Sequence, residues 1–271
     1  MNQEDRLDYL VEALKEDSVQ YRDREVPRQD RRKIMRSLMN IRMPKQINPH
    51  FLKIQDDFLQ EEAVEKKIIS LYEIPTVKQE YQSQKSQADK ISIWQGDITR
   101  LAVDAIVNAA NSQMLGCFVP CHACIDKAIH SAAGVELREA CNQYMVQKRK
   151  EIPMYEEPTG RAVVTSGFNL PAKYVIHTVG PIVQWEVTDR LRQDLKNCYA
   201  SCLMAAVEKG IRSIAFCCIS TGEFHFPNEE AAEIAVETVT EFLTEHESSF
   251  DRVIFNVFKD LDKDIYKSIL G

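Results

Sequence analysis

Two cysteines and one histidine in the middle of the chain form its clearest candidate for a metal site. Cys117, His122 and Cys124 follow the spacing C-x4-H-x-C. Thiolate sulfur combined with imidazole nitrogen favours zinc among the common metal ions. Three protein ligands leave one tetrahedral position open, which is typical of catalytic rather than structural zinc sites. We therefore predict Zn²⁺ as the cofactor of this protein.

Two alternatives to a catalytic zinc stay open on this pattern. Cys121 lies within the run but outside the spacing, and as a fourth ligand it would close the site and make the zinc structural. The cysteines can also be buried thiols that bind no metal. Four further cysteines lie in apolar patterns and are interpreted in that second way: Cys198, Cys202, Cys217 and Cys218.

A second candidate site is a turn of small residues in the C-terminal half. Residues 213–219 read as a buried strand, and a helix is expected to start near Pro227. A small-residue turn ahead of a helix presents backbone N–H groups to an anion, which suits a diphosphate, although the same pattern also serves as a simple helix cap. The residues of this turn are Ser220, Thr221, Gly222, Glu223 and Phe224.

Three polar residues near expected strand ends have two interpretations each. Asp97 can accept a hydrogen bond from an adenine amino group, or it ends a strand as a turn residue. Asn108 and Asn111 can bind sugar hydroxyls, or they cap the following loop. His130 lies on an expected helix and is interpreted as a packed core histidine.

The elements that must position these residues alternate between strands and helices. Short apolar strands are expected at 91–94, 105–109, 162–165, 174–178, 213–219 and 253–258. Helical patterns fall at 124–132, 191–206, from 227 onward, and 260–270. This alternation predicts an α/β/α sandwich around a mostly parallel or mixed sheet.

The N-terminal part reads differently. Helices are expected near 7–14, 30–39 and 58–71, and a polar segment over 80–90 marks a boundary. We predict a helical N-terminal extension over residues 1–88, packed as a cap on a main domain over residues 89–271.

Composition excludes several functional classes. The 271-residue chain is 44% hydrophobic and carries a net charge of −7. It lacks the basic surface on which sequence-independent nucleic-acid binding depends, so no nucleic-acid partner is expected. No apolar run approaches the ~20 residues that span a bilayer, and the polar, acidic N-terminus carries no signal-peptide pattern. We expect a cytoplasmic protein without a membrane partner.

Several segments together resemble the macrodomain family. The resemblance rests on residues 96–99, 104–111, 125–130, 132–134, 174–181, 220–222 and 226–227. It covers roughly residues 91–271, and residues 38–42 and 54–57 resemble the N-terminal extension of one subfamily. It implies a three-layer α/β/α macrodomain with a mixed central sheet, a preceding helical extension, and binding of ADP-ribose.

One departure from the common macrodomain pattern makes the chain resemble one subfamily in particular. The usual glycine-rich loop is replaced here by residues 117–124, which is similar to the zinc-dependent bacterial macrodomains, a group of protein-ADP-ribose hydrolases. Their ligand spacing carries over to Cys117, His122 and Cys124. Asp126 matches the acidic residue of the hydrolytic loop, where it orients a water or accepts its proton, and it can also cap the helix.

The resemblance also assigns the remaining site residues. It implies that Asp97 and Ile98 hold the adenine and that the backbone of Ser220 to Phe224 cradles the diphosphate. Asn111 then positions the distal ribose and contributes to catalysis, and the ligand-binding loop includes Cys124, Ile125 and Asp126.

The expected activity is removal of mono-ADP-ribose from modified proteins. The resemblance implies a lipoyl-carrying relative of glycine cleavage protein H as the modified protein. Two alternatives stay open: a non-catalytic ADP-ribose reader with structural zinc, and a deacetylase acting on O-acetyl-ADP-ribose.

Overall fold

The computed structural model describes residues 1–120 and 122–271, and these residues form two compact units. Unit 1 comprises Met1–Lys67, Met114–Tyr155 and Phe168–Leu170. Unit 2 comprises Ile68–Gln113, Glu156–Gly167 and Pro171–Gly271. The units are groups of contacting segments, whereas the boundary predicted near residue 88 divides the chain in sequence order and stays a prediction.

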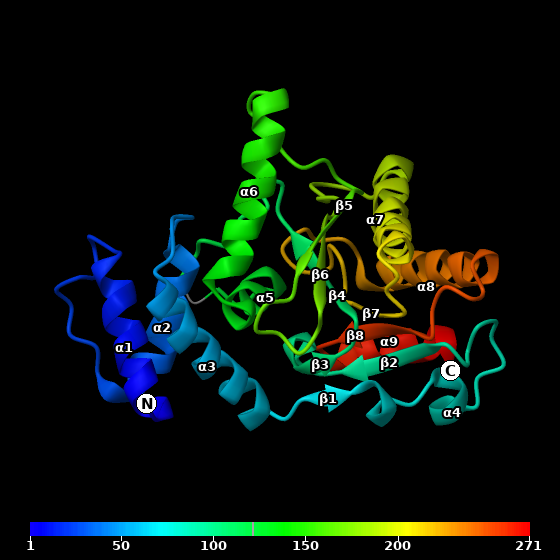
Figure 1. Cartoon of the computed structure of the whole chain (residues 1–271). Helices are drawn as coiled ribbons and strands as arrows, with labels where there is room; N and C mark the ends of the chain where they lie inside the picture. Colours follow the sequence, from blue (N-terminus) through cyan, green and yellow to red (C-terminus); the bar gives the residue numbers. More distant parts are fainter. Residues whose placement is uncertain (121) are drawn as a thin grey trace. The chain divides into compact units, whose positions relative to one another are not determined.

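Unit 2 is built on a six-stranded mixed sheet (Figure 1). Its strands lie in the order β2-β8-β7-β4-β6-β5, and β5 alone among them runs antiparallel to its neighbour. The strands are β2 (Ile91–Gln95), β4 (Ala105–Ala110), β5 (Ala162–Ser166), β6 (Tyr174–Val179), β7 (Ser213–Phe216) and β8 (Arg252–Val257). A separate parallel pair joins β1 (Ile69–Ser70) to β3 (Leu101–Ala102).

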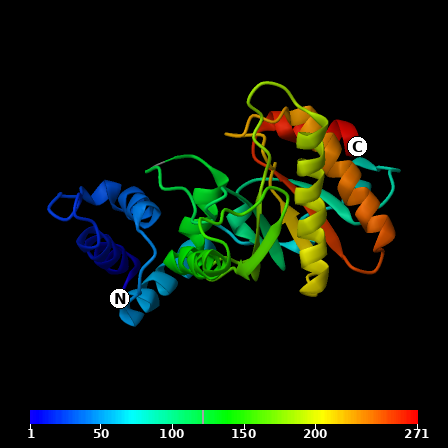
Figure 2. The same ribbon diagram turned by 90° about the horizontal axis from the view of Figure 1, so that it is seen from above.

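Apolar strands and amphipathic helices explain why this sheet forms. The parallel strands β4, β6, β7 and β8 are almost entirely buried, as expected for strands that are covered on both faces. Helix α7 (Asp189–Glu208) packs against β5 and β6, and α8 (Asn228–Glu245) packs beside α7 (Figure 2). Helix α9 (Asp260–Leu270) covers β2 and β8, and α4 (Val77–Tyr81) lies against β2.

The sheet topology sets where functional loops can meet. Strands β2, β8, β7, β4 and β6 are parallel, so their carboxyl ends lie along one edge of the sheet. The loops that begin with Gly96, Asn111 and Cys217 therefore leave the sheet at this same edge.

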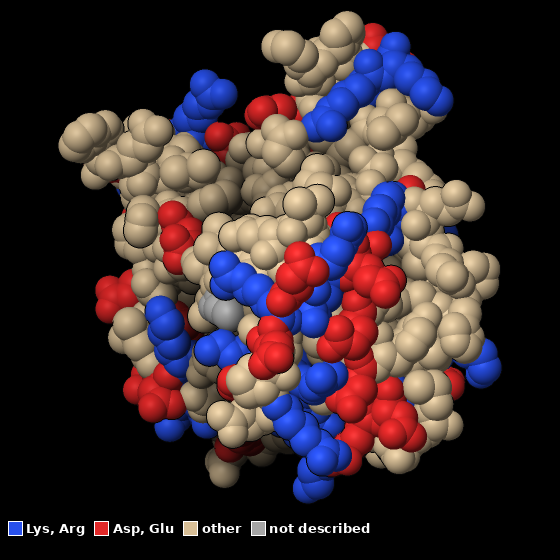
Figure 3. All heavy atoms as spheres, turned by 90° about the vertical axis from the view of Figure 1, so that its left-hand side faces the viewer, with Lys and Arg blue, Asp and Glu red and all other residues tan. Residues whose placement is uncertain are grey.

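Unit 1 is helical. It contains α1 (Gln3–Glu16), α2 (Arg31–Ile41), α3 (Pro49–Glu65), α5 (Ile125–Ala133) and α6 (Val135–Glu151). Acidic and basic side chains intermingle on the face shown in Figure 3. Unit 1 contains several ion pairs, among them Arg31 with Asp8 at 3.1 Å. Its apolar core consists of Leu10, Val11, Leu14, Met35, Leu38, Met39, Phe51, Ile54, Phe58, Leu59 and Val135.

The expected mixed α/β fold and the N-terminal helices are confirmed, with two differences. The third helix begins at Pro49, behind the N-cap Asn48, and ends at Glu65 instead of running over 58–71. The 17-residue helix α6 was not expected, because its buried positions are separated by long polar side chains. Within the described ranges, no helix combines the length and apolarity needed to cross a bilayer.

Glu62 of α3 provides a test of how unit 1 is held together. It is 4% exposed and pairs with Arg36 and, at 3.1 Å, with Lys66. Burial alone raises its pKa, but these cations outweigh burial and lower the pKa below the usual value. Glu62→Gln leaves the cations without a counter-charge, and we expect chemical denaturation to show a loss of about 1–3 kcal/mol.

The matched control is Glu65→Gln, because Glu65 pairs with Arg32 at 2.9 Å on the exposed side of the same helix. We expect that substitution to change stability by less than about 1 kcal/mol. Equal losses in the two variants would contradict a special role for Glu62.

Candidate active site

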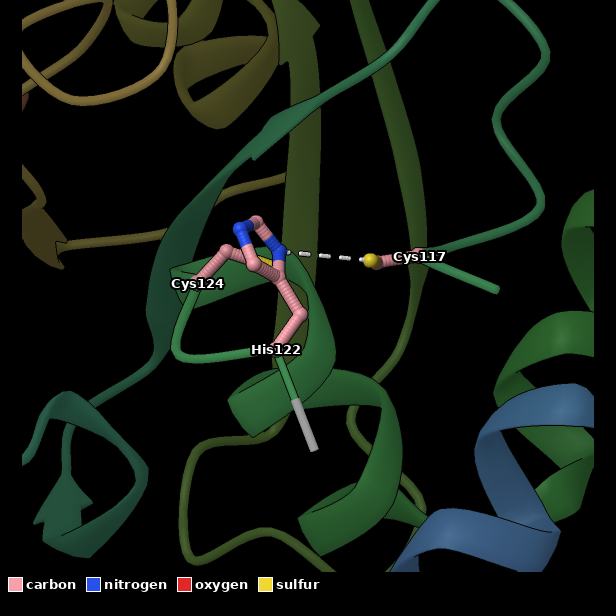
Figure 4. Close-up of side chains that lie close together, drawn as sticks. All are labelled: Cys117, His122 and Cys124. Atoms are coloured by element: carbon pink, nitrogen blue, oxygen red, sulfur yellow. Dashed lines mark hydrogen bonds between the residues drawn. The ribbon is translucent and has the colours of Figure 1, made fainter. Parts of the chain in front are cut away.

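The three predicted metal ligands come together in unit 1. Cys117 and His122 lie in the loop before α5, and Cys124 is the N-cap residue of that helix. Their ligand atoms all lie within 4.8 Å of one another, and all three side chains are half-buried. The Cys117 sulfur is 3.5 Å from His122 Nδ1, and Figure 4 shows the imidazole turned toward that sulfur.

This donor set fits a tetrahedral zinc ion. Zinc bonds of about 2.3 Å to sulfur and 2.0–2.1 Å to nitrogen place neighbouring ligand atoms about 3.5 Å apart. The observed separation of Cys117 Sγ from His122 Nδ1 is 3.5 Å. Cys121, which was considered as a fourth ligand, lies outside the described residues.

The surroundings of Cys124 oppose its thiolate form in the absence of a cation. Burial raises the pKa of the Cys124 thiol to about 12, and the negative charges of Cys117 and Asp126 act in the same direction. The Lys127 backbone N–H, 3.5 Å from the Cys124 sulfur, lowers it only in part. A divalent cation reverses this balance, because thiols bind metals after losing their protons.

Asp126 lies in the first turn of α5, two residues after Cys124. It is 5% exposed, and its Oδ1 is 3.4 Å from His130 Nε2. His130 is 4% exposed and so occupies the buried position expected for it. Ile125 opens the helix between Cys124 and Asp126, so the expected loop residues are contiguous with the metal ligands.

The predicted adenine-binding residues follow β2 in unit 2. Asp97 is the N-cap of a short 3-10 turn, where its Oδ1 accepts hydrogen bonds from the Thr99 backbone N–H at 3.0 Å and hydroxyl at 2.7 Å. Ile98 is 1% exposed. The turn interpretation of Asp97 therefore describes its local contacts, and any adenine contact is made from this fixed position.

Asn108 and Asn111 differ sharply in environment. Asn108 is fully buried on β4, and its amide nitrogen is 3.1 Å from His177 Nδ1 on β6. It is therefore a structural residue and not a sugar ligand. Asn111 lies beyond the strand end and is partly exposed, with its Oδ1 accepting a hydrogen bond from Gln113 N at 3.0 Å.

The loop between β7 and α8 is folded into tight turns. Ser220 has a positive φ of 65°, and its carbonyl accepts a hydrogen bond from Phe226 N at 3.0 Å. Within residues 1–120 and 122–271, the N–H groups of Thr221, Gly222 and Phe224 donate to no backbone oxygen. Such N–H groups can donate to an anion, and binding of a diphosphate by this loop stays a prediction.

Gly180, at the end of β6, contributes to this loop in a way that the sequence analysis did not identify. A Cβ on Gly180 would lie 2.1 Å from Ser220 Oγ and 2.9 Å from Ile219 Cγ2. Ser220 Oγ is buried and has no hydrogen-bond partner among the described residues. Three residues further on, Val183 N donates to Phe224 O at 2.9 Å. The absence of a side chain at Gly180 is thus what lets the two loops lie together.

A mixed α/β sheet with polar loops at the carboxyl edge of its parallel strands belongs to the class of open α/β folds that bind ligands at that edge. The chain belongs to the macro domain family. The family model, described as the Macro domain, matches residues 107–235.

Curated relatives match the whole chain. It is 46% identical to a protein-ADP-ribose hydrolase of Treponema medium, over 100% of both chains. It is 41% identical to a protein-ADP-ribose hydrolase of Staphylococcus aureus strain MRSA252, over 97% of this chain and 94% of that protein.

Solved macrodomain structures resemble it as well. The Trypanosoma brucei macrodomain in complex with ADP-ribose aligns with a TM-score of 0.66 at 28% identity, covering 87% of this chain and 95% of that one. The Oceanobacillus iheyensis macrodomain with ADP aligns with a TM-score of 0.59 at 41% identity, covering 66% and 90%. These likenesses confirm the macrodomain fold expected from the sequence.

The pH dependence of stability tests the burial of His177, which pairs with Asn108. It is fully buried, with Thr165 Oγ1 3.0 Å from its Nε2, and burial lowers its pKa from 6.5 to about 3. The unfolded chain therefore binds a proton that the folded chain rejects, so stability falls as pH falls below 6.5. We expect a slope of about 1.4 kcal/mol per pH unit from this residue, measured by urea unfolding between pH 7 and pH 4.

In His177→Gln the acid-side slope is expected to become shallower by about that amount, while the stability at neutral pH also falls because the new side chain packs less well. His50→Gln, at an exposed histidine, serves as the control and keeps the original slope. An unchanged slope in His177→Gln would show that another group dominates.

Proposed function

We propose that this protein is a zinc-dependent hydrolase that removes mono-ADP-ribose from modified proteins. One observation carries the proposal: the Cys117, His122 and Cys124 donors cluster within 4.8 Å at the start of the helix that also carries Asp126. The family and the curated relatives support ADP-ribose chemistry in a chain of this length.

The proposed ligand contacts follow from the loops of unit 2. Asp97 and Ile98 bind the adenine, and the backbone N–H groups of Ser220 to Phe224 cradle the diphosphate. Asn111 binds the distal ribose. The Trypanosoma brucei relative in complex with ADP-ribose supports a nucleotide ligand for this fold.

The proposed reaction is cleavage of the bond between the anomeric carbon of the distal ribose and a protein side chain by water. The Asp126 carboxylate accepts a proton from the attacking water as the water oxygen bonds to the anomeric carbon, and the same carboxyl group then gives that proton to the departing side chain. His130 Nε2, one helical turn further along α5, lies 3.4 Å from Asp126 Oδ1. Zinc bound by Cys117, His122 and Cys124 would polarise an oxygen ligand at its open coordination position.

The proposed substrate is a modified carrier protein. The resemblance to zinc-dependent bacterial macrodomains supports a lipoyl-carrying relative of glycine cleavage protein H as substrate. We propose this carrier as the first modified protein to test, and a cytoplasmic location for the reaction.

Metal removal and two substitutions test the proposal directly. Purified protein is assayed for release of ADP-ribose from a mono-ADP-ribosylated protein, with bound zinc measured by elemental analysis. We expect one zinc per chain in the native protein. Chelation and Cys117→Ser are expected to abolish release. Asp126→Asn keeps the size of the side chain but not the proton acceptor, so kcat should fall by about 10²–10⁴-fold.

Binding measurements by calorimetry separate the alternatives. ADP-ribose binding is expected to persist in Asp126→Asn, because that substitution removes a proton acceptor and not a diphosphate contact. Binding without any release by fully zinc-loaded native protein would instead support a reader. Release of acetate from O-acetyl-ADP-ribose, with modified protein untouched, would support the deacetylase alternative.

The contact between Gly180 and Ser220 predicts a selective binding defect. Gly180→Ala places a methyl group 2.1 Å from Ser220 Oγ and must displace the proposed diphosphate loop. We expect the ADP-ribose affinity to fall at least about tenfold, equivalent to 1.4 kcal/mol, as measured by calorimetry.

The control is Gly210→Ala at the end of α7. Gly210 has a φ of 72°, and a Cβ there would meet nothing within 4 Å, so this variant acquires backbone strain without a loop clash. It should lose some stability and keep its ADP-ribose affinity. Native affinity in Gly180→Ala would place the diphosphate elsewhere.

A further inference from the structure

A single buried arginine, Arg138 of α6, joins the metal-ligand loop to the N-terminal helices within unit 1. Arg138 is 5% exposed. Its Nε donates to Leu115 O at 2.6 Å. Its Nη1 donates to the carbonyls of Met39 at 3.0 Å, Asn40 at 2.7 Å and Arg42 at 2.6 Å. A buried cation is stable only when its donors are satisfied, so its charge holds these carbonyls in place.

On the loop side, the contacts of Arg138 bracket the metal ligand Cys117. Leu115, whose carbonyl accepts from Nε, lies two residues before it. The Phe118 ring directly follows it, with the guanidinium carbon 4.4 Å from the ring centroid. Gly116 between them has a φ of 78°, and a Cβ there would lie 3.1 Å from Arg138 Nη2. Arg138 thus contacts the chain on both sides of Cys117, through a backbone carbonyl before it and an aromatic ring after it.

On the other side, Arg138 caps the carboxyl end of α2. The last carbonyls of a helix have no partner within the helix and carry a partial negative charge. The guanidinium satisfies those of Met39 and Asn40, and that of the C-cap residue Arg42. Asn40 adds a weaker link, because its Nδ2 donates to Val119 O at 3.4 Å. The helix end and the ligand loop therefore share one set of contacts.

We propose that Arg138 is a positioning residue for the ligand Cys117, and that through it the N-terminal helices set the metal affinity of the site. This inference rests on the zinc site proposed above. Arg138 acts through the Leu115 carbonyl and the Phe118 ring and not by touching substrate. Removing such a supporting contact typically weakens metal binding 10–100-fold.

The test measures zinc affinity by competition with a chromogenic chelator, together with the absorption spectrum of the Co²⁺-substituted protein. Arg138→Lys keeps the charge but loses the planar fork that reaches both sides. We expect its zinc affinity to fall about tenfold or more, with a shifted Co²⁺ spectrum. Phe118→Leu should lose less, and the double variant should lose less than the sum of the two, because both report one contact.

Arg252→Gln is the matched control, since Arg252 Nη1 donates to Ile74 O at 2.7 Å within unit 2. It should lower the melting temperature and leave zinc affinity unchanged. If Arg138→Lys does not fold, Phe118→Leu alone decides, because it changes only a loop side chain. If the variants that fold, Arg138→Lys or Phe118→Leu, keep the native zinc affinity and an unchanged Co²⁺ spectrum, the inference is overturned while the zinc site stands. A native protein that binds no zinc would overturn both.

Discussion

Parallel strand pairing is the constraint on which the arrangement of the unit 2 loops depends. Because β2, β8, β7, β4 and β6 all run in one direction, residues distant in sequence leave the sheet at one edge. Asp97, Asn111 and the loop beginning at Ser220 share that edge for this reason alone. The sheet itself needs only buried apolar strands, so its loops are free to carry polar residues without loss of the core.

The helices of unit 1 are held together by buried polar groups as well as by an apolar core. Gln55 of α3 accepts a hydrogen bond from Val135 N at 2.9 Å and so caps the start of α6. Asn169 donates to Asp56 at 2.7 Å and to the last carbonyl of α5, that of Ala133, at 3.1 Å. These bonds are directional, so they fix helix ends in a way that apolar packing does not.

Patterns that are local in sequence predicted most of this architecture. The ligand spacing, the strands from 91 onward and the helix after Pro227 each depend on neighbouring residues, and the structure has them. Helix α6 was not predicted because its few buried apolar positions lie among many charged side chains; these positions are Val135, Leu137, Cys141 and Met145. The roles of Arg138 and Gly180 were not predicted for another reason. They come from contacts with residues distant in the chain, which sequence spacing does not reveal.

The segment from Met114 to Cys124 depends both on local sequence spacing and on contacts with residues distant in the chain. Its described residues form neither helix nor strand, and ordering such a loop costs conformational entropy. The contacts that offset this cost are those of Arg138, the Asn40 amide and the Cys124 cap on α5. Each of them acts on Cys124 or on a residue within two positions of Cys117. Ordering the loop and bringing Cys117, His122 and Cys124 together are therefore one event, so a ligand held by these three side chains would also stabilise the loop.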